Sequence, residues 1–156
     1  LYSSQSTRGW PFFVRVCHPG GSAGTDPRNE EGARIVEGHR VWLIPDGYLP
    51  ERSTGDQVSH EAICVLNTGS ENAHLRLNFY FEDQEPVKDV LVSVGAERTR
   101  HLRLDDPETL GGIVLPRGVP YAIRVESDVP VTVQHSRLDT SQAALTLMTT
   151  IAHPVA

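Results

Sequence analysis

The chain of 156 residues has few cysteines, no long apolar run and no targeting signal at its N-terminus. Its two cysteines, Cys17 and Cys64, form neither a CxxC unit nor a disulfide framework, which favours a reducing compartment. No apolar stretch is long enough to cross a membrane. The N-terminus does not fit a signal peptide because the short apolar segment FFVRV contains Arg15. Together these absences predict a cytoplasmic protein.

Basic residues are scarce as well, and the formal net charge is -6. An acidic protein is not expected to bind nucleic acid or anionic lipid strongly, since both require a cationic surface. The single basic cluster is RTRHLR at Arg98–Arg103. A solvated sheet face is the ordinary explanation of such a cluster, and docking of an anionic ligand or a partner protein is the alternative. Phosphate-binding loops, zinc knuckles and RNA-binding signatures are absent.

The composition changes near residue 38, which predicts two regions. Residues 18–38 are rich in glycine, proline and charge, and the only apolar island before them is WPFFVRVC at residues 10–17. We therefore interpret residues 1–37 as an N-terminal extension, either flexible or an artefact of the gene start, with a docking arm for a partner as the alternative. Residues 38–156 form the predicted domain, which is long enough to bury a core.

From Arg40 onward, short runs rich in β-branched and aromatic residues alternate with turn signals, among them Asp128. The runs cover residues 40–45, 60–67, 73–81, 88–94, 98–104, 121–127, 130–138 and 146–152. Only Thr140–Leu147 has helical character, as one or two turns capped by Thr140 or Ser141. This pattern predicts an all-β fold, an antiparallel β-sandwich or jelly roll of about eight strands.

The run Val131–Asp139 combines an apolar face with charged side chains. Because side chains alternate along a strand, Val131 and Val133 share one face with His135 and Arg137. Burying these two polar groups without partners would cost several kcal/mol, by the usual order of magnitude. Either the strand ends at the rim of the fold, or both side chains meet partners in a polar pocket.

Two other motifs contain the residue types of hydrolases. Ser59, His60 and Glu61 are adjacent on a predicted strand, so their side chains point alternately to opposite faces and cannot form a catalytic triad among themselves. His60 or Glu61 can instead line the same pocket as His135, or each can be a satisfied structural residue. Gly20–Gly24 fits G-x-S-x-G, but no helix repeat of an α/β hydrolase follows, and a flexible linker explains it better.

The seven histidines raise the possibility of a metal site. Among them, His60, His101, His135 and His153 lie in predicted strands or at their ends. The chain lacks the His-x-His pair that often supplies metal ligands in β-barrels. We therefore predict no metal, no other cofactor and no catalytic residue.

A string of motifs, in this order along the chain, resembles the sensory rhodopsin transducer family. The matching segments are Trp42, Asp46–Pro50, Ser59–Glu61, Cys64–Asn67, Glu85–Pro86, Arg98–His101, His135–Asp139 and Thr150–Ala152. The resemblance covers about residues 38–156 and is specific, because several multi-residue motifs occur in the right order.

This resemblance implies a small cytosolic β-sandwich that assembles as a homotetramer. The founding member is a soluble transducer for a microbial rhodopsin, and the wider family is regarded as domains that bind small molecules such as sugars. Catalysis is not known in the family. The resemblance therefore implies a non-enzymatic transducer or small-molecule-binding module whose partner is a membrane photoreceptor or another signalling protein.

The same resemblance and the residue chemistry together predict the ligand-binding residues. They are Trp42, Tyr48, His60, Glu61, His135, Arg137 and Asp139. Planar polar groups beside an aromatic face are typical of sites for hydroxyl-rich ligands. A structural alternative is that Arg137 pairs with Asp139 or Glu61 and holds a strand end. Two other functions are an enzyme acting on a sugar-like substrate through Glu61 and His135 as acid and base, and a protein-binding scaffold.

Overall fold

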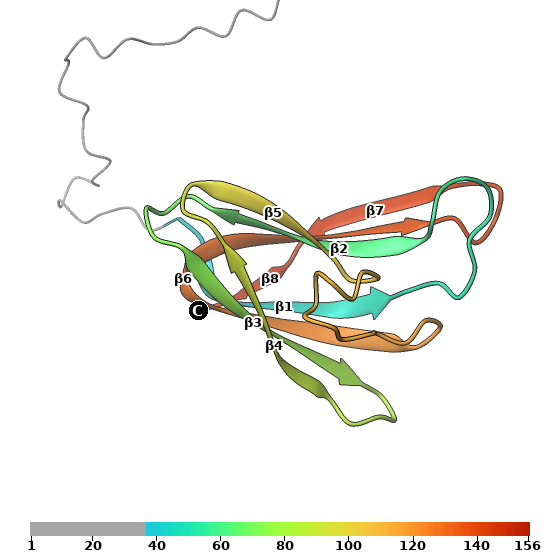
Figure 1. Cartoon of the computed structure of the whole chain (residues 1–156), viewed down its shortest axis with the longest axis horizontal. Coiled ribbons are helices and arrows are strands. Elements are labelled where there is room, and N and C mark those ends of the chain that lie inside the picture. The colour runs from blue at the N-terminus through green and yellow to red at the C-terminus, as the bar shows by residue number, and fades with distance from the viewer. Residues whose placement is uncertain (1–36) are drawn as a thin grey trace, which may run out of the picture. The chain divides into compact units, whose positions relative to one another are not determined.

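The computed structural model describes residues 37–156, and this part of the chain is an all-β unit without a helix (Figure 1). Its eight strands are β1 (His39–Tyr48), β2 (His60–Asn67), β3 (Ala73–Phe81), β4 (Val87–Val94), β5 (Arg98–Arg103), β6 (Pro120–Asp139), β7 (Thr146–Ile151) and β8 (His153–Val155). The predicted fold class is confirmed. The predictions for residues 1–36, which concern the extension, the docking arm and the Gly20–Gly24 motif, lie outside the described residues. Among residues 37–156 no helix has the length and hydropathy needed to span a membrane.

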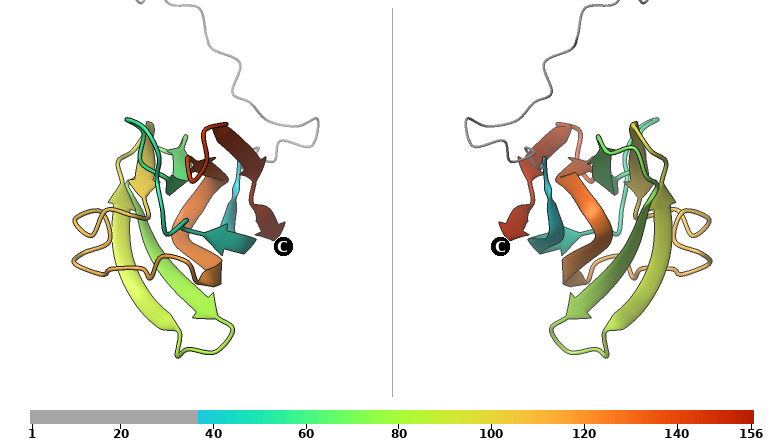
Figure 2. Two further views of the ribbon diagram at one scale, coloured as in Figure 1. Left: turned by 90° about the vertical axis from the view of Figure 1, so that its right-hand side faces the viewer. Right: turned by 90° about the vertical axis from the view of Figure 1, so that its left-hand side faces the viewer.

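The long strand β6 belongs to two sheets. Its first half pairs with β1 and β3 in the order β4-β3-β6-β1-β8, and its second half pairs with β2 and β7, while β5 lies beyond β2. All of these pairings are antiparallel. The orange ribbon of β6 bends from one layer into the other (Figure 1), and the end-on views show the two layers facing each other (Figure 2). The fold is therefore a sandwich in which one strand joins both layers.

The core lies between these layers and follows the alternation of the strands. In β3, every second side chain from Ala73 to Phe79 is buried, and the residues between them are exposed except for Asn78. The facing sheet contributes Ile63, Val65, Leu102 and Val133, all of which are fully buried. Each large apolar side chain removed from water in this way contributes about 1.5–3 kcal/mol. The sandwich is thus held by a continuous apolar layer, and the polar residues within it need their own partners.

One of the predicted turns is absent. Asp128 was expected to separate two strands, but β6 runs through it without a break. The Asp128 carboxylate accepts the backbone N–H of His74 at 2.7 Å, and its backbone carbonyl accepts a hydrogen bond from Arg40. These contacts supply hydrogen-bond donors to the carboxylate and the carbonyl of Asp128 while its backbone stays extended. The prediction of two separate strands was therefore wrong.

The predicted helical turns in Thr140–Leu147 are also absent, because Ser141–Ala144 form bends and β7 begins at Thr146. Thr140 is buried, and its side chain bonds to the hydroxyl of Ser59 at 3.0 Å. The Asp139 carboxylate accepts the backbone N–H of Ser141 at 2.8 Å. These contacts with the opposite loop and within a tight turn replace the helical hydrogen bonds.

Candidate functional site

The centre of the candidate site is the carboxylate of Glu61 on the inner face of β2. In the sheet register, Glu61 lies opposite Arg137 and Ile63 lies opposite His135, so Glu61, His135 and Arg137 share one face of the sheet. Glu61 is 0% exposed and His135 is 1% exposed. Of the two partners that the sequence left open for Arg137, Glu61 and Asp139, the structure pairs it with Glu61, and the buried His135 contacts the same carboxylate.

Four hydrogen bonds saturate the Glu61 carboxylate. Its Oε1 accepts the backbone N–H of Tyr48 at 3.0 Å, His135 Nε2 at 3.1 Å and Arg137 Nε at 2.7 Å. Its Oε2 accepts the hydroxyl of Tyr121. Since an ionised carboxylate can only accept hydrogen bonds, His135 carries its proton on Nε2 in this arrangement. We call Glu61, His135, Arg137 and Tyr121, with the N–H of Tyr48, the Glu61 network.

Arg137 connects this network to the surface. Its side chain is 19% exposed, and its Nη2 contacts the carboxylate of Asp46 at 3.2 Å and the Asp46 carbonyl at 3.3 Å. Asp46 itself is 76% exposed. Arg137 thus contacts the buried Glu61 through Nε and the exposed Asp46 through Nη2, so it links the network to the surface.

The electrostatics of the network favour its charged form. Burial pushes the pKa of the Glu61 carboxyl upward, but the hydrogen bonds described above, led by that from His135, outweigh burial and lower it below its ordinary value. Burial and the neighbouring Glu61 charge raise the pKa of the Tyr121 hydroxyl, so it stays protonated and donates. For Arg137, burial lowers the pKa, but the Glu61 and Asp46 contacts outweigh it and raise the pKa, so Arg137 stays charged.

The lowered pKa of Glu61 predicts a loss of stability in acid. A carboxyl with a folded-state pKa below its unfolded value stabilises the fold above the unfolded value, and the stabilisation is lost as the pH falls through the folded-state pKa. We expect the free energy of unfolding, measured by urea titration, to fall as the pH drops below about 4.5, the ordinary value for Glu61. Glu61→Gln should show a shallower fall. An equal pH dependence of the variant and the parent would contradict this assignment.

Three predicted ligand-binding residues lie away from the Glu61 carboxylate. Trp42 is buried between β6 and β8, and its indole N–H donates to the carbonyls of His39 at 3.0 Å and Val131 at 3.1 Å. His60 is half-buried on the other face of β2, with Nδ1 2.8 Å from the carbonyl of Val58. The carboxylate of Asp139 is bonded to the backbone N–H of Ser141, not to Arg137. The structure brings together Tyr48, Glu61, His135 and Arg137 only.

The side-chain contacts also separate the members of the Ser59-His60-Glu61 motif. The Ser59 hydroxyl donates to the carbonyl of Arg52 at 3.1 Å and bonds to Thr140, while His60 and Glu61 contact the groups named above. Their alternation on the strand is as predicted. Within residues 37–156, no three histidine, cysteine or acidic side chains gather closely enough to hold a metal ion.

Sequence reasoning missed Tyr121 and a second ionic group next to the network. Asp105 receives two hydrogen bonds from Arg103, at 2.8 and 2.9 Å, and lies 3.5 Å from Arg117. Arg117 Nη1 also donates to the carbonyls of Pro50 and Ser59 at 2.9 and 3.1 Å. A buried tyrosine needs a hydrogen-bond partner, so Tyr121 could have been suspected from its place in an apolar run. The partners of Asp105 depend on the long loop between β5 and β6 and have no sequence signal.

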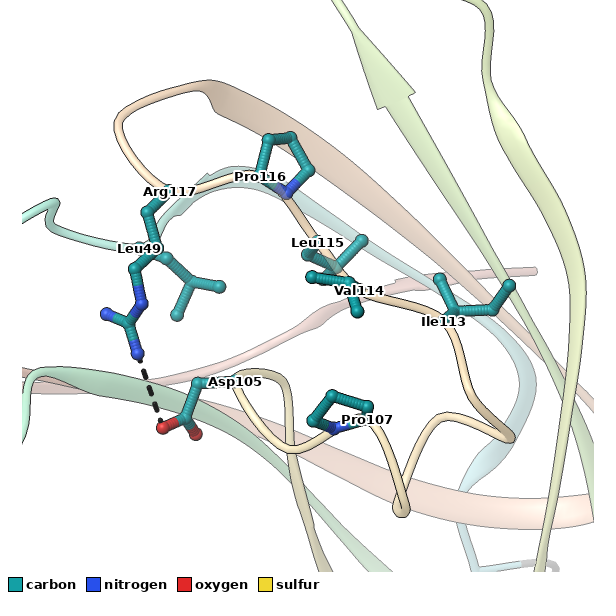
Figure 3. A pocket seen from close by; sticks show the side chains of 8 residues that line it. All are labelled: Leu49, Asp105, Pro107, Ile113, Val114, Leu115, Pro116 and Arg117. Atoms are coloured by element: carbon teal, nitrogen blue, oxygen red, sulfur yellow. Dashed lines mark ion pairs between the residues drawn. The ribbon is translucent and has the colours of Figure 1, made fainter.

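This second group borders a hollow of about 240 Å³ (Figure 3). The hollow is lined by Leu49, Asp105, Pro107, Ile113, Val114, Leu115, Pro116 and Arg117. Most of these residues come from the loop Leu104–Val119, whose length is typical of functional loops. Aliphatic and proline side chains form its walls, and the Asp105–Arg117 ion pair lies on one side.

The network and its strands lie within a segment that matches a known family. The family model described as Anabaena sensory rhodopsin transducer (ASRT) matches residues 37–154. The chain belongs to the ASRT family. This confirms the family that the motif string predicted, and the matched segment contains the whole Glu61 network.

Two solved structures are similar to this ASRT-family chain. The crystal structure of Thermotoga maritima 1070 is 44% identical, covers 76% of this chain and 96% of its own, and has a TM-score of 0.68. The Anabaena sensory rhodopsin transducer is 38% identical, covers 70% of this chain and 96% of its own, and has a TM-score of 0.59. Among curated proteins, none matches the chain.

Proposed function

We propose that this ASRT-family chain is a non-enzymatic, cytosolic signal transducer that works by binding other molecules. The observation that carries the proposal is the closed Glu61 network: the groups best suited to acid–base chemistry are consumed by contacts within the fold. General acid–base catalysis needs a group that reaches the substrate directly or through one water. Glu61 and His135 are 3.1 Å apart but fully buried, so they contact each other rather than a substrate.

The small molecule in this proposal is a hydroxyl-rich, sugar-like ligand. Two places in the described residues can receive it. One is Arg137 where it contacts the exposed carboxylate of Asp46, because the guanidinium and the carboxylate offer a planar donor and a planar acceptor there. The other is the hollow beside Asp105 and Arg117, which offers both charges and apolar walls.

We expect a matching ligand to raise the melting temperature of the full chain. At 100 times its Kd, such a ligand adds about 2.7 kcal/mol, and because each kcal/mol raises the melting temperature of a domain of this size by about 4 °C, the expected shift is roughly 10 °C. The measurement is a thermal-shift titration with sugars, sugar acids and polyols. Asp46→Ala should reduce the shift if the ligand binds at Arg137, and Arg117→Gln should reduce it if the ligand occupies the hollow. If no compound in the panel shifts the melting temperature, the sugar-like ligand is contradicted. If both variants keep the full shift, both proposed binding places are contradicted.

The protein partner in this proposal is a membrane photoreceptor or another signalling protein, as the name of the Anabaena relative suggests. The basic cluster supports it because β5 is an edge strand that pairs only with β2. Arg98 and Arg100 are exposed there, and their guanidinium groups donate to the backbone carbonyls of Glu97 and Ser93. A cationic edge of this kind fits an anionic cytoplasmic surface.

A pull-down from detergent-solubilised membranes tests the partner. We expect the full chain to recover a membrane protein, and we expect Arg98→Gln with Arg100→Gln to reduce the recovery at least about tenfold through lost charge complementarity. Arg76→Gln, which removes an exposed arginine from β3, is the matched control. Equal recovery by the double variant and the parent would remove β5 from the docking surface.

The proposal includes the homotetramer that the family resemblance implies. Its support in the structure is an exposed apolar strand, β7, at the edge of the second sheet.

A further inference from the structure

The guanidinium of Arg117, at one side of the hollow, has an edge that the described residues leave without a hydrogen bond. Its Nη1 donates to the backbone carbonyls of Pro50 and Ser59 at 2.9 and 3.1 Å. Its Nη2 lies 3.5 Å from an oxygen of Asp105, which is longer than an ordinary N–H···O hydrogen bond of about 2.7–3.2 Å. Within residues 37–156, neither Nε nor Nη2 makes a hydrogen bond. This Nε–Nη2 edge is therefore free to bind an acceptor.

The carboxylate of Asp105 does not need this edge, because Arg103 already pairs with it. Nε and Nη2 of Arg103 donate to the two oxygens of Asp105 at 2.8 and 2.9 Å, which is a bidentate pair. Burial raises the pKa of the Asp105 carboxyl, but the hydrogen bonds from Arg103 outweigh burial and lower it, so Asp105 stays ionised. Two arginines and one carboxylate leave one positive charge beside the hollow, that of Arg117.

The hollow beside this charge is apolar and small. Figure 3 shows the guanidinium of Arg117 on one side and the side chain of Ile113 on the opposite side. The volume of the hollow is about 240 Å³. A cavity of about 150 Å³ is enough to hold benzene, whereas sites for drug-sized ligands begin at about 300 Å³. The hollow therefore has room for about six carbon atoms and one polar group.

We propose that the hollow binds a small monocarboxylate with an apolar body, whose carboxylate lies on the Nε–Nη2 edge of Arg117. This inference rests on the ligand-binding role proposed above and names a ligand class for the hollow. The two parallel N–H groups of a guanidinium edge match the two oxygens of a carboxylate. A phosphate dianion would need a second free cation, and Arg103 is committed to Asp105.

Arg117 is held in place without a ligand. The two carbonyls that accept from its Nη1 belong to the two ends of the segment between β1 and β2, and the N–H of Gly118 donates to the carbonyl of Leu49 at 2.8 Å. A donor that is already positioned loses less conformational freedom when a ligand binds. The Arg117 side chain is 34% exposed, so a ligand can reach it while these contacts stay intact.

The test is a titration of the isotope-labelled full chain with benzoate, followed in proton–nitrogen correlation spectra that include the arginine Nε–H signals. We expect saturable shifts of the Arg117 Nε–H signal and of the amides of Leu104–Val119. Benzamide, which is neutral and of nearly the same shape, should bind at least about tenfold more weakly, because it cannot form a charge-assisted pair. Equal binding of benzamide, or no saturable shift at Arg117, would overturn the proposal.

Two variants test the position of the bound charge. Arg117→Gln should weaken benzoate binding at least about tenfold. Val114→Asp leaves the contacts of Arg117 intact and places a negative charge at a lining position that is 74% exposed, so it should weaken binding roughly threefold by repulsion. Leu91→Asp, at a position of β4 that is 72% exposed, is the matched control and should bind like the parent. Equal affinities of Val114→Asp and Leu91→Asp would exclude the hollow as the site.

Glu51 allows a test of the opposite sign. Its carboxylate packs against Gly118, the residue that follows Arg117. Glu51→Gln removes a negative charge near the proposed carboxylate and should strengthen benzoate binding roughly twofold. Weaker binding in this variant would contradict the proposed position of the carboxylate.

Two comparisons separate the ligand class from the proposed function. Phenyl phosphate should bind more weakly than benzoate, and equal or tighter binding would overturn the carboxylate class. If benzoate does not bind but a sugar raises the melting temperature, this inference is wrong and the proposed function stands. If benzoate binds at Arg117 and no sugar shifts the melting temperature, this inference stands and the sugar-like ligand is contradicted.

Discussion

Replacing Glu61 by leucine is expected to lower the free energy of unfolding by about 3–5 kcal/mol, which is a large part of the stability of a domain of this size. The substitution leaves the charged Arg137 without its shortest hydrogen bond, of 2.7 Å, and leaves the buried His135 and Tyr121 without their acceptor. Each of these groups stays buried or half-buried and cannot be fully rehydrated. Urea unfolding at pH 7 measures the effect.

Two further variants show whether the loss comes from the uncompensated charge. Glu61→Leu combined with Arg137→Met should recover part of the stability lost in Glu61→Leu, because a buried ion pair replaced by apolar side chains is often tolerated. Asp46→Ala removes only the exposed partner of Arg137 and should cost less than about 1 kcal/mol. If the double variant were no more stable than Glu61→Leu, the pairing of Glu61 with Arg137 would not be the main contribution.

Replacing Gly47 by alanine is expected to cost about 3 kcal/mol, at the upper end for overpacking of a core. A Cβ at Gly47 would overlap the ring of Tyr121. That ring cannot move aside easily, because it packs edge-to-face against Phe79 and Phe81, with ring centres 5.9 and 6.2 Å away, and its hydroxyl is bonded to Glu61. Thermal and urea unfolding of the variant give the cost.

Gly95→Ala is the control for this substitution. A Cβ at Gly95 would be 3.4 Å from the side chain of Arg98, which is an ordinary contact on an exposed turn. Neither Gly47 nor Gly95 has a positive φ, so the two substitutions differ in the space available and not in backbone strain. We expect Gly95→Ala to change stability by less than about 1 kcal/mol. Equal costs at the two positions would show that Tyr121 can relax away from Gly47.

The sequence predicted the strands well where alternation and composition agree. β2 and β3 have the predicted bounds, His60–Asn67 and Ala73–Phe81, because β2 is a short run that is apolar on both faces and the apolar residues of β3 recur at every second position. The turn predicted at Asp128 is absent because turn propensity is local, whereas the hydrogen bonds that hold Asp128 extended come from β1 and β3. Bonds between distant segments also replaced the expected helical turns after Thr140.

The sequence predicted which kinds of polar side chain could meet at the candidate site, but it did not specify which of the candidate residues do so. Alternation placed His135 and Arg137 on one face with two valines, which left two possibilities, a strand end at the rim or partners in a polar pocket. Glu61 and Asp139 were the candidate partners, and the structure pairs both side chains with Glu61. The choice between Glu61 and Asp139 depends on the register of β2 against β6, which no single-sequence pattern specifies. Trp42 was predicted to contact a ligand but is buried in the core. The sequence does not distinguish these roles, because a tryptophan in a motif can pack in the core or contact a ligand.

The membership of β6 in both sheets has a consequence for how the domain unfolds. Tyr121, near the start of β6, and Arg137, near its end, hold the same carboxylate of Glu61, although one belongs to the first layer and the other to the second. Unfolding of the first layer would break the hydrogen bond between Tyr121 and Glu61, and unfolding of the second would break the one between Arg137 and Glu61. We therefore expect the two sheets to unfold together as one cooperative unit, because Glu61 is bonded to both of them. A substitution at Asp46 or Arg137 should then lower the stability of both layers.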